Sequence, residues 1–210
     1  MRLGIYGGSF DPVHYGHLLL AECCREQCAL DQVWFVPAYR SPHKRGGAQV
    51  EPRHRAAMLR LAVAGHPAFQ VSTCELEREE VSYTVETLSA IRAARPDDQL
   101  FFLLGGDALS DFPQWREPRR IAALATLVAV HRSGSPPPDF RRLAEALGED
   151  LSRELAGHEV EMPGVDFSSR DLRLRVAAGQ SIRFRTPRAV EEYISQHGLY
   201  RNSTNPPAPT

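Results

Sequence analysis

The fold of this 210-residue chain is decided by residues 2–20, which read RLGIYGGSFDPVHYGHLLL. Apolar residues at 2–6 predict a buried strand, and the apolar spacing from about 16 to 29 predicts a helix. Gly7 and Gly8 lie between them, where the chain must turn and where backbone N–H groups can approach an anion without a Cβ in the way. The turn is therefore either a phosphate cradle or only a tight connection.

The alternation of strand and helix continues along the chain. Further strands are expected at residues 32–36, 69–72, 100–104 and 126–131, with helices at 52–64, 84–94 and 117–124. Apolar strands that alternate with helices are typical of a parallel sheet covered on both faces. The sequence therefore predicts a doubly wound, Rossmann-like α/β fold. Helical segments are expected to follow at 139–155, after Ser169 and after Pro187, where the last helix ends at Gly198.

Length and composition predict one domain. A chain with 42% hydrophobic residues can bury a single core, which we assign to residues 1–201. The proline-rich residues 202–210 are expected to form a disordered tail. The longest apolar stretch, 121–130, is too short to span a bilayer, and no secretory signal is evident, so a cytoplasmic protein without membrane contact is expected. Three of the four cysteines share one predicted helix, which favours packing thiols over disulfides or a metal site.

The charge pattern favours small anions over nucleic acid as partners. The formal net charge is −1, and basic residues cluster only at 40–45 and 170–188, so local anion sites are expected. Lys44 is the only lysine among the 25 lysine and arginine residues. A compact ammonium on a flexible loop suits a point contact to a phosphate better than the rigid fork of arginine, so Lys44 is a candidate catalytic cation.

Two histidines follow the glycine turn. His14 and His17 are three residues apart at the start of a helix, so both imidazoles can point back toward the turn. The sequence has neither the Gly-Lys-Ser/Thr of a P-loop nor the Gly-x-Gly-x-x-Gly of a dinucleotide fingerprint. A zinc site would need further ligands, and none is evident. We therefore interpret the histidines as an anion-stabilising pair.

Residues 7–17, GGSFDPVHYGH, resemble the signature of the adenylyltransferases of the HxGH nucleotidyltransferase superfamily. Phosphopantetheine adenylyltransferases and cytidylyltransferases share this opening, so later segments must distinguish among them. Nearly the whole chain resembles the bacterial nicotinate-nucleotide adenylyltransferases. The segments that carry this resemblance are SPHK at 41–44, SYTVETL at 82–88, FLLGGDAL at 102–109, FPQW at 112–115 and the serines at 168–169.

The resemblance implies three groups of site residues. The catalytic group is His14, His17, Lys44 and Arg173. The residues that bind ATP are Gly7, Gly8, Ser9, Phe10, Gly16, Gly105, Asp107, Arg132, Ser168 and Ser169. The residues that bind a pyridine mononucleotide are Thr84, Trp115 and Arg116. Trp115 follows a strand-to-helix crossing, where a flat ring can stack on pyridine; the alternative is a core tryptophan, as expected for Trp34.

Ser168 is expected to cap the helix that follows it, in a capping box with Asp171. The same helix start carries Ser169, Arg170 and Arg173, and is a second anion site for the β and γ phosphates. The family pattern has threonine where this chain has Arg170 and isoleucine at position 172, where it has leucine. Arg170 is then either an extra phosphate contact or part of a solvated face.

The reaction that the resemblance implies is adenylyl transfer from ATP to nicotinate mononucleotide, giving nicotinate adenine dinucleotide and pyrophosphate in NAD biosynthesis. The attacking 5′-phosphate is largely dianionic at pH 7, because its second pKa is roughly 6, so no general base is needed. No protein carboxylate is evident for a metal and Asp11 is interpreted as a turn residue, so Mg²⁺ is expected to arrive with ATP. Nicotinamide mononucleotide or phosphopantetheine as acceptor stays open, as does a non-catalytic nucleotide-binding regulator. The sequence does not give the oligomeric state.

Overall fold

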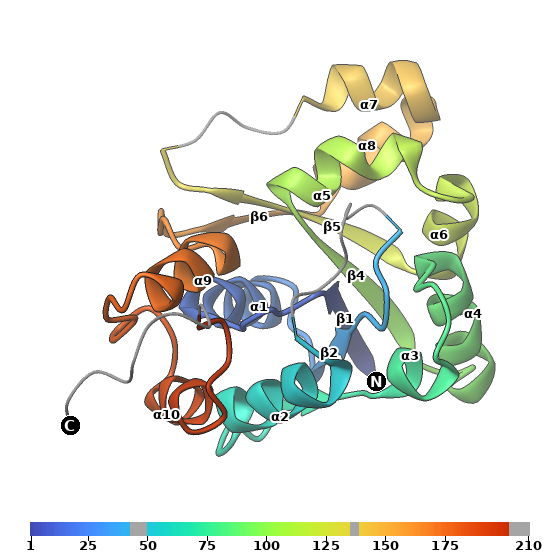
Figure 1. Cartoon of the computed structure of the whole chain (residues 1–210). Helices are drawn as coiled ribbons and strands as arrows, with labels where there is room; N and C mark the ends of the chain where they lie inside the picture. The colour runs from blue at the N-terminus through green and yellow to red at the C-terminus, as the bar shows by residue number, and fades with distance from the viewer. Residues whose placement is uncertain (43–49, 135–138, 202–210) are drawn as a thin grey trace.

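A computed structural model describes residues 1–42, 50–134 and 139–201 and contains a six-stranded sheet (Figure 1). The strands are β1 (Arg2–Gly8), β2 (Gln32–Pro37), β3 (Phe69–Val71), β4 (Gln99–Gly105), β5 (Thr126–Arg132) and β6 (Glu159–Met162). Their order is β3-β2-β1-β4-β5-β6, and every neighbouring pair is parallel. The strand order reverses direction between β1 and β4, which places a ligand crevice at the carboxyl ends of these two strands. The Rossmann-like prediction is confirmed.

Helices cover both faces of the sheet (Figure 1). One face carries α1 (Tyr15–Gln27), α2 (Pro52–Val63), α9 (Ser169–Ala177) and α10 (Arg188–Gln196). The other carries α4 (Thr84–Ala94), α5 (Gly106–Asp111), α6 (Pro118–Leu124), α7 (Phe140–Leu147) and α8 (Glu149–Gly157). A short helix α3 (Cys74–Arg78) and a 3-10 turn η1 (Phe112–Gln114) complete the described elements.

Strand β4 shows why the apolar runs are nearly continuous. Phe101 and Leu103 belong to the hydrophobic cluster beneath α1 and α2, whereas Phe102 and Leu104 belong to the cluster beneath α4 and α6. Alternate side chains of a strand point to opposite faces, and both faces are covered here. All four side chains are therefore buried, and the sheet is the centre of a three-layer structure.

Most expected elements are present, with ends shifted by one or two residues. The segment 139–155 forms two helices, which meet at Gly148 in the left-handed region, with φ of 97°. Four elements were not expected from the sequence: α3, α5, η1 and the edge strand β6. The four residues of β6 read EVEM and alternate exposed with buried, and so short a segment with two glutamates carries little strand signal.

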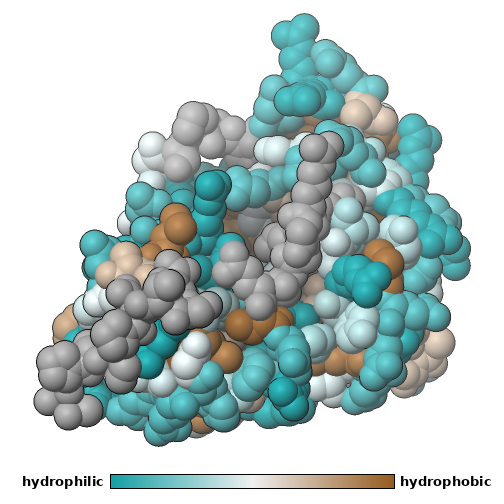
Figure 2. Space-filling model, viewed as in Figure 1, coloured by the Kyte–Doolittle hydropathy of each residue, from teal (hydrophilic) through white to brown (hydrophobic). Residues whose placement is uncertain are grey.

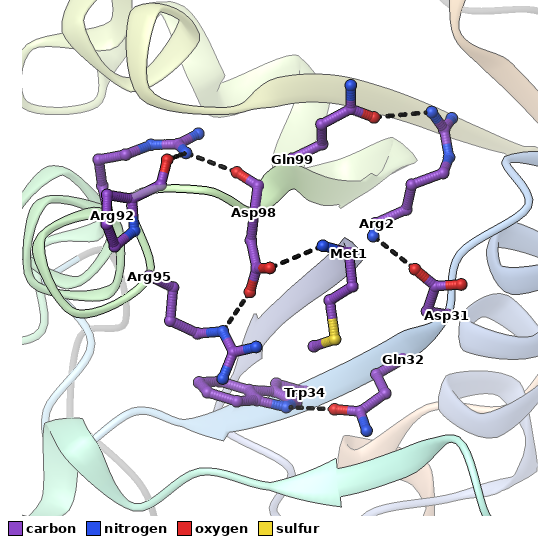
Figure 3. Close-up of polar contacts among 10 residues, drawn as sticks. Met1, Arg2, Asp31, Gln32, Trp34, Arg92, Arg95, Asp98 and Gln99 are labelled. Carbon is purple, nitrogen blue, oxygen red and sulfur yellow. Dashed lines mark hydrogen bonds and ion pairs between the residues drawn. The ribbon is translucent and has the colours of Figure 1, made fainter.

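Side-chain contacts tie together the amino ends of the strands, at the edge of the sheet opposite the crevice (Figure 3). The Met1 amine lies 2.7 Å from Asp98 Oδ1, and Arg92 donates to the carbonyl oxygen of Asp98 at 2.6 Å. Trp34, expected in the core, is only partly buried at this edge. Its ring lies 5.6 Å from the Arg95 guanidinium, and its Nε1 donates to Gln32 at 3.3 Å. The expectation of a core tryptophan is therefore partly right: Trp34 packs against the hydrophobic cluster beneath α4 and α6, but its side chain is not fully buried.

The surface in Figure 2 is mostly hydrophilic, with hydrophobic atoms in scattered patches. Within the three described ranges, no helix has both the length and the apolar character needed to cross a membrane. All four cysteines are free thiols. The predicted tail at 202–210 and the candidate Lys44 lie outside the described residues.

Candidate active site

The loop between β1 and α1 is fixed by side chains from later parts of the chain. Its backbone carbonyl oxygens accept hydrogen bonds at Ser9 from Arg55 (2.9 Å), at Asp11 from Arg173 (2.7 Å), at Pro12 from Ser169 (2.8 Å) and at Val13 from Thr186 (2.7 Å). Carbonyl oxygens would repel an anion if they faced it. Because these four are bound by protein donors, the loop is held rigid and their partial negative charge is compensated.

The turn lies two residues later than the glycines suggest. Gly7 and Gly8 belong to β1, where they pair with Val36 and Pro37, so the prediction that they form the turn was wrong. The left-handed residue is Phe10, with φ of 47°. Gly8 instead leaves room for the Phe10 ring, because a Cβ there would lie 3.0 Å from that ring.

Phe10 anchors the loop rather than facing a ligand with its side chain. The side chain is 2% exposed, and its ring packs edge-on against Tyr6 at 5.4 Å and against His17 at 5.1 Å. Only its backbone can therefore contact ATP, and the implied role of Phe10 in ATP binding is limited to that. The buried ring holds the loop against the core and sets the position of His17.

The imidazole rings of His14 and His17 lie face to face. The ring centroids are 3.7 Å apart with 26° between the planes, and the backbone N–H of His14 donates to His17 Nδ1 at 3.2 Å. Because Nδ1 accepts, the hydrogen of the His17 ring lies on Nε2, which can donate to an anion. Gly16 allows this packing, since a Cβ at position 16 would lie 3.1 Å from the His14 ring.

His14 is neutral at physiological pH in this environment. Burial lowers its pKa to about 4, and the positive charge of Arg132 acts in the same direction. Arg132 ends β5 and is itself exposed, so this predicted ATP-binding residue does lie close enough to influence His14. A neutral imidazole next to an arginine is a site that gains from a bound anion, because the anion offsets the positive charge.

Helix α9 begins next to the β1–α1 loop. Ser168 caps it by accepting from the Asp171 backbone N–H at 3.1 Å, as expected. The Asp171 carboxylate pairs with Arg185 at 2.9 Å, which replaces the second half of the expected capping box. Ser169 and Arg173, predicted to bind phosphate, also hold the loop through Pro12 and Asp11. Arg170 is exposed, which favours the solvated face.

Asp11 is more than a turn residue. Its carboxyl group is 3% exposed and accepts from the Tyr200 hydroxyl at 2.6 Å. Asp11 acts electrostatically on Arg55, whose side chain is completely buried. Arg55, Thr186 and Tyr200 could not be predicted from the sequence, because none belongs to a motif and their partners lie 46, 173 and 189 residues away.

The predicted pyridine-nucleotide residues are close together on the other side of the crevice. Thr84 is the first residue of α4, and Arg116 packs over the preceding Tyr83 at 4.7 Å and pairs with Glu86 at 2.9 Å. Trp115 is partly buried, with its ring edge-on to Phe102 at 6.0 Å and to Phe112 at 5.5 Å. One end of this ring therefore belongs to the core, so the core interpretation of Trp115 is partly right.

The remaining predicted residues lie where β4 ends. Gly105 is its last residue, and Asp107 is exposed in the first turn of α5. Both are thus at the carboxyl edge of the sheet, beside the switch point. Within the described ranges, no three His, Cys, Asp or Glu side chains gather closely enough to hold a metal ion. Lys44, also predicted for this site, cannot be placed from the described residues.

Comparison with known proteins agrees with this geometry. Residues 5–175 match the cytidylyltransferase-like family model. A probable nicotinate-nucleotide adenylyltransferase of Roseiflexus castenholzii is 46% identical over 95% of this chain and 98% of that protein. A protein of the same name from Thermus thermophilus is 47% identical over 96% of this chain and 100% of its own.

A solved structure extends the likeness to the fold. The Plasmodium falciparum nicotinic acid mononucleotide adenylyltransferase, complexed with NaAD, superposes with a TM-score of 0.75 at 18% identity, covering 95% of this chain and 97% of that one. At 18% identity, this superposition shows similarity of fold alone. The family-model match and the close bacterial relatives settle the rest: this chain belongs to the cytidylyltransferase-like family, among the nicotinate-nucleotide adenylyltransferases.

Proposed function

We propose that the protein transfers the adenylyl group of ATP to nicotinate mononucleotide, giving nicotinate adenine dinucleotide and pyrophosphate. The observation that carries nucleotidyl transfer is the stacked pair of His14 and His17 on a loop that α9 holds directly. The choice of acceptor is supported by the 46–47% identity to bacterial proteins of that name over nearly the whole chain.

The ATP end of the site would lie over the β1–α1 loop. The Nε2–H of His17 and the neutral His14 would donate to phosphate oxygens, with Arg132 adding positive charge nearby. Arg173 uses one of the five N–H groups of a guanidinium on Asp11, so others would be available for the β and γ phosphates. Ser168 and Ser169 would contribute through the backbone N–H groups at the start of α9. Lys44 would supply a further mobile cation.

The acceptor end would lie between α4 and the residues after η1. The pyridine ring would stack on the exposed part of Trp115, and Thr84 with the backbone after Trp115 would take the nicotinate carboxylate. Arg116 would add a positive charge, although its guanidinium is shared with Glu86. Gly105 and Asp107, at the end of β4 between the two halves, would face the ribose.

The chemistry needs positioning and charge compensation rather than a general base. An oxygen of the acceptor 5′-phosphate forms a bond to the α-phosphorus of ATP, and the bond from that phosphorus to the β-bridging oxygen breaks. Pyrophosphate leaves with the electron pair. Negative charge grows on the leaving group and on the α-phosphate oxygens, where donors already in place stabilise it. We propose that Mg²⁺ enters as part of MgATP, held by phosphates and water.

The test is an acceptor comparison with purified protein and MgATP. Pyrophosphate release and product mass are measured with nicotinate mononucleotide, nicotinamide mononucleotide and phosphopantetheine, and with CTP in place of ATP. We expect kcat/KM to be at least about tenfold higher for ATP with nicotinate mononucleotide than for any other pair. Faster turnover of another pair would change the substrate, and no pyrophosphate release from any pair would leave a nucleotide-binding protein without catalysis.

A further inference from the structure

We infer that Arg55 is a positioning residue that fixes the distance between two parts of the site. These are the β1–α1 loop, which forms the ATP half, and the start of α4, which belongs to the acceptor half. This inference rests on the proposed function, because it assumes that the two halves hold the two reacting phosphates. It concerns a residue outside every motif discussed above. Its evidence is a continuous set of hydrogen bonds from the β1–α1 loop to the start of α4.

The first links belong to Arg55 itself. Its side chain is completely buried, and the residue lies at the end of the first turn of α2. Nη1 donates to the carbonyl oxygen of Ser9 at 2.9 Å, and Nη2 donates to the carbonyl oxygen of Tyr39 at 3.2 Å. Ser9 follows β1 and Tyr39 follows β2, so one planar guanidinium bridges the loops that leave two neighbouring parallel strands.

The next links run from Tyr39 to the acceptor half. The Tyr39 backbone N–H donates to Ser82 Oγ at 2.9 Å, and the Ser82 backbone N–H donates to the carbonyl oxygen of Arg40 at 2.9 Å. Ser82 is 8% exposed and lies two residues before Thr84, where α4 begins. The path therefore joins the loop that carries the histidines to the helix that carries the predicted carboxylate contact.

Burial makes these bonds difficult to replace. Burial lowers the pKa of Arg55, and the nearby Asp11, Tyr200 and Glu75 partly offset that effect. A buried guanidinium must keep its hydrogen-bond partners, because an unsatisfied charged donor is costly. Lysine in the same place ends in a single ammonium and cannot span two carbonyl groups with a planar fork. The change Arg55→Lys therefore keeps the charge and removes the bridge.

The two halves would then bind their substrates but hold them less accurately. Reaction between two bound phosphates depends on their relative placement, and a displacement of about 1 Å can cost on the order of a hundredfold in rate. Binding of each substrate to its own half depends much less on the relative placement of the two halves. We expect R55K to lower kcat by roughly ten- to a hundredfold and to change each KM by less than about threefold.

Arg92 offers a matched control. Its guanidinium also bridges backbone carbonyl groups, donating to Asp98 at 2.6 Å, to Pro96 at 3.4 Å and to Leu124 at 2.9 Å. This bridge lies at the amino ends of the strands, where Figure 3 shows Arg92 beside Asp98. R92K removes the same kind of bridge far from the crevice. We expect R92K to keep kcat within about twofold of the wild type.

A second pair of variants covers the case in which R55K does not fold. Ser82→Ala removes the acceptor for the Tyr39 N–H together with a hydroxyl that bonds the buried Glu75 carboxyl group. Ser89→Ala removes a hydroxyl that donates within α4, to the carbonyl oxygen of Val85 at 2.7 Å. We expect S82A to lower kcat several-fold with little change in KM, and S89A to leave kcat unchanged. Amide hydrogen exchange gives a readout that does not depend on turnover. R55K or S82A should speed exchange in residues 9–14 and in residues 81–84 together. R92K or S89A should speed exchange in neither segment.

The outcomes separate the two claims. Wild-type protein that transfers no adenylyl group to any acceptor would overturn the proposed function, and the exchange measurement would still test the bridge. An active wild type with R55K indistinguishable from R92K in kcat and exchange would overturn only the inference. So would a variant in which a KM rises while kcat stays constant, because Arg55 would then serve the binding of one substrate.

Discussion

The imidazole of His14 lies flat on that of His17, with centroids 3.7 Å apart, and the His14 backbone N–H donates to His17 Nδ1. This contact fixes which His17 nitrogen carries a hydrogen and where that hydrogen can be offered. His17 is therefore oriented before any ligand arrives, which is the condition for stabilising charge that develops during a reaction.

Replacing His17 with alanine should lower kcat by on the order of a hundredfold or more, because a preorganised donor to the reacting phosphates is removed. The fold should survive, and a melting temperature within a few degrees of the wild type would show this. His66→Ala is the control, since His66 also stacks on a ring, Phe69, at 3.8 Å but is not part of the β1–α1 loop. Near-normal turnover in H17A would remove His17 from the mechanism.

The buried His14 should make stability depend on pH. Its folded pKa of about 4 lies below the model value of 6.5, so between these values the unfolded chain binds more protons. This contribution is fully present above pH 6.5 and is lost as pH falls toward 4, by about 3 kcal/mol in the free energy of unfolding. Urea denaturation at pH 7 and pH 4.5 on the wild type and on H14N measures it. An equal pH slope in both proteins would contradict the assignment.

Lys44→Arg should reduce turnover more than stability. Arginine keeps the positive charge, but its planar fork cannot replace a compact, mobile ammonium at a point contact to phosphate. Steady-state kinetics together with a melting curve compare the two effects. A matched change, Arg53→Lys, alters an exposed cation that pairs only with Glu51 in the described structure. We expect it to change neither the turnover nor the melting temperature. An unchanged rate in K44R would take Lys44 off the list of catalytic residues.

Tyr200→Phe should destabilise the protein by about 1–3 kcal/mol, because the buried Asp11 carboxylate loses a hydroxyl donor. Urea denaturation gives the difference from the wild type. Tyr15→Phe is the control, since Tyr15 is 41% exposed and loses only a hydroxyl at the surface. If the two variants were equally stable, the bond from Tyr200 would not hold the end of the chain to the loop.

Gly8→Ala should destabilise the protein by about 1–3 kcal/mol through overpacking, because the new Cβ would lie 3.0 Å from the buried Phe10 ring. Gly157→Ala is the matched change, since nothing lies within 4 Å of a Cβ there and alanine is favoured at a helical position. Thermal melting of both variants makes the comparison. A stable G8A would show that the Phe10 ring can move without cost.

The fold could be predicted largely because its core strands carry an unusually clear pattern. Strands such as β4, buried on both faces, leave little ambiguity, and the helices between them follow from their apolar spacing. The edge strand β6 could not be predicted, since its pairing with β5 is set by the neighbouring strand rather than by its own residues. The position of the turn could not be predicted from Gly7 and Gly8, because Gly8 provides space for the Phe10 ring and the left-handed residue is Phe10 itself.

The site also contains residues that could be predicted from the sequence and residues that could not. His14 and His17 could be predicted because their relationship is local, within one turn of helix. The donors that hold the loop could not, because each is brought there by tertiary packing from far along the chain. Ser169 and Arg173 were found through the resemblance, but their contacts to Pro12 and Asp11 appear only in three dimensions.

The loop at residues 9–13 is synthesised early, whereas Ser169, Arg173 and Thr186, three of the donors for its carbonyl groups, are synthesised near the end. A nascent chain that has produced only the sheet strands up to β5 still lacks these three donors. Nucleotide binding should therefore appear late in folding and coincide with the docking of α9 and the segment that follows it. Bound ATP would then report that the whole chain, and not only its first motif, has reached its native arrangement.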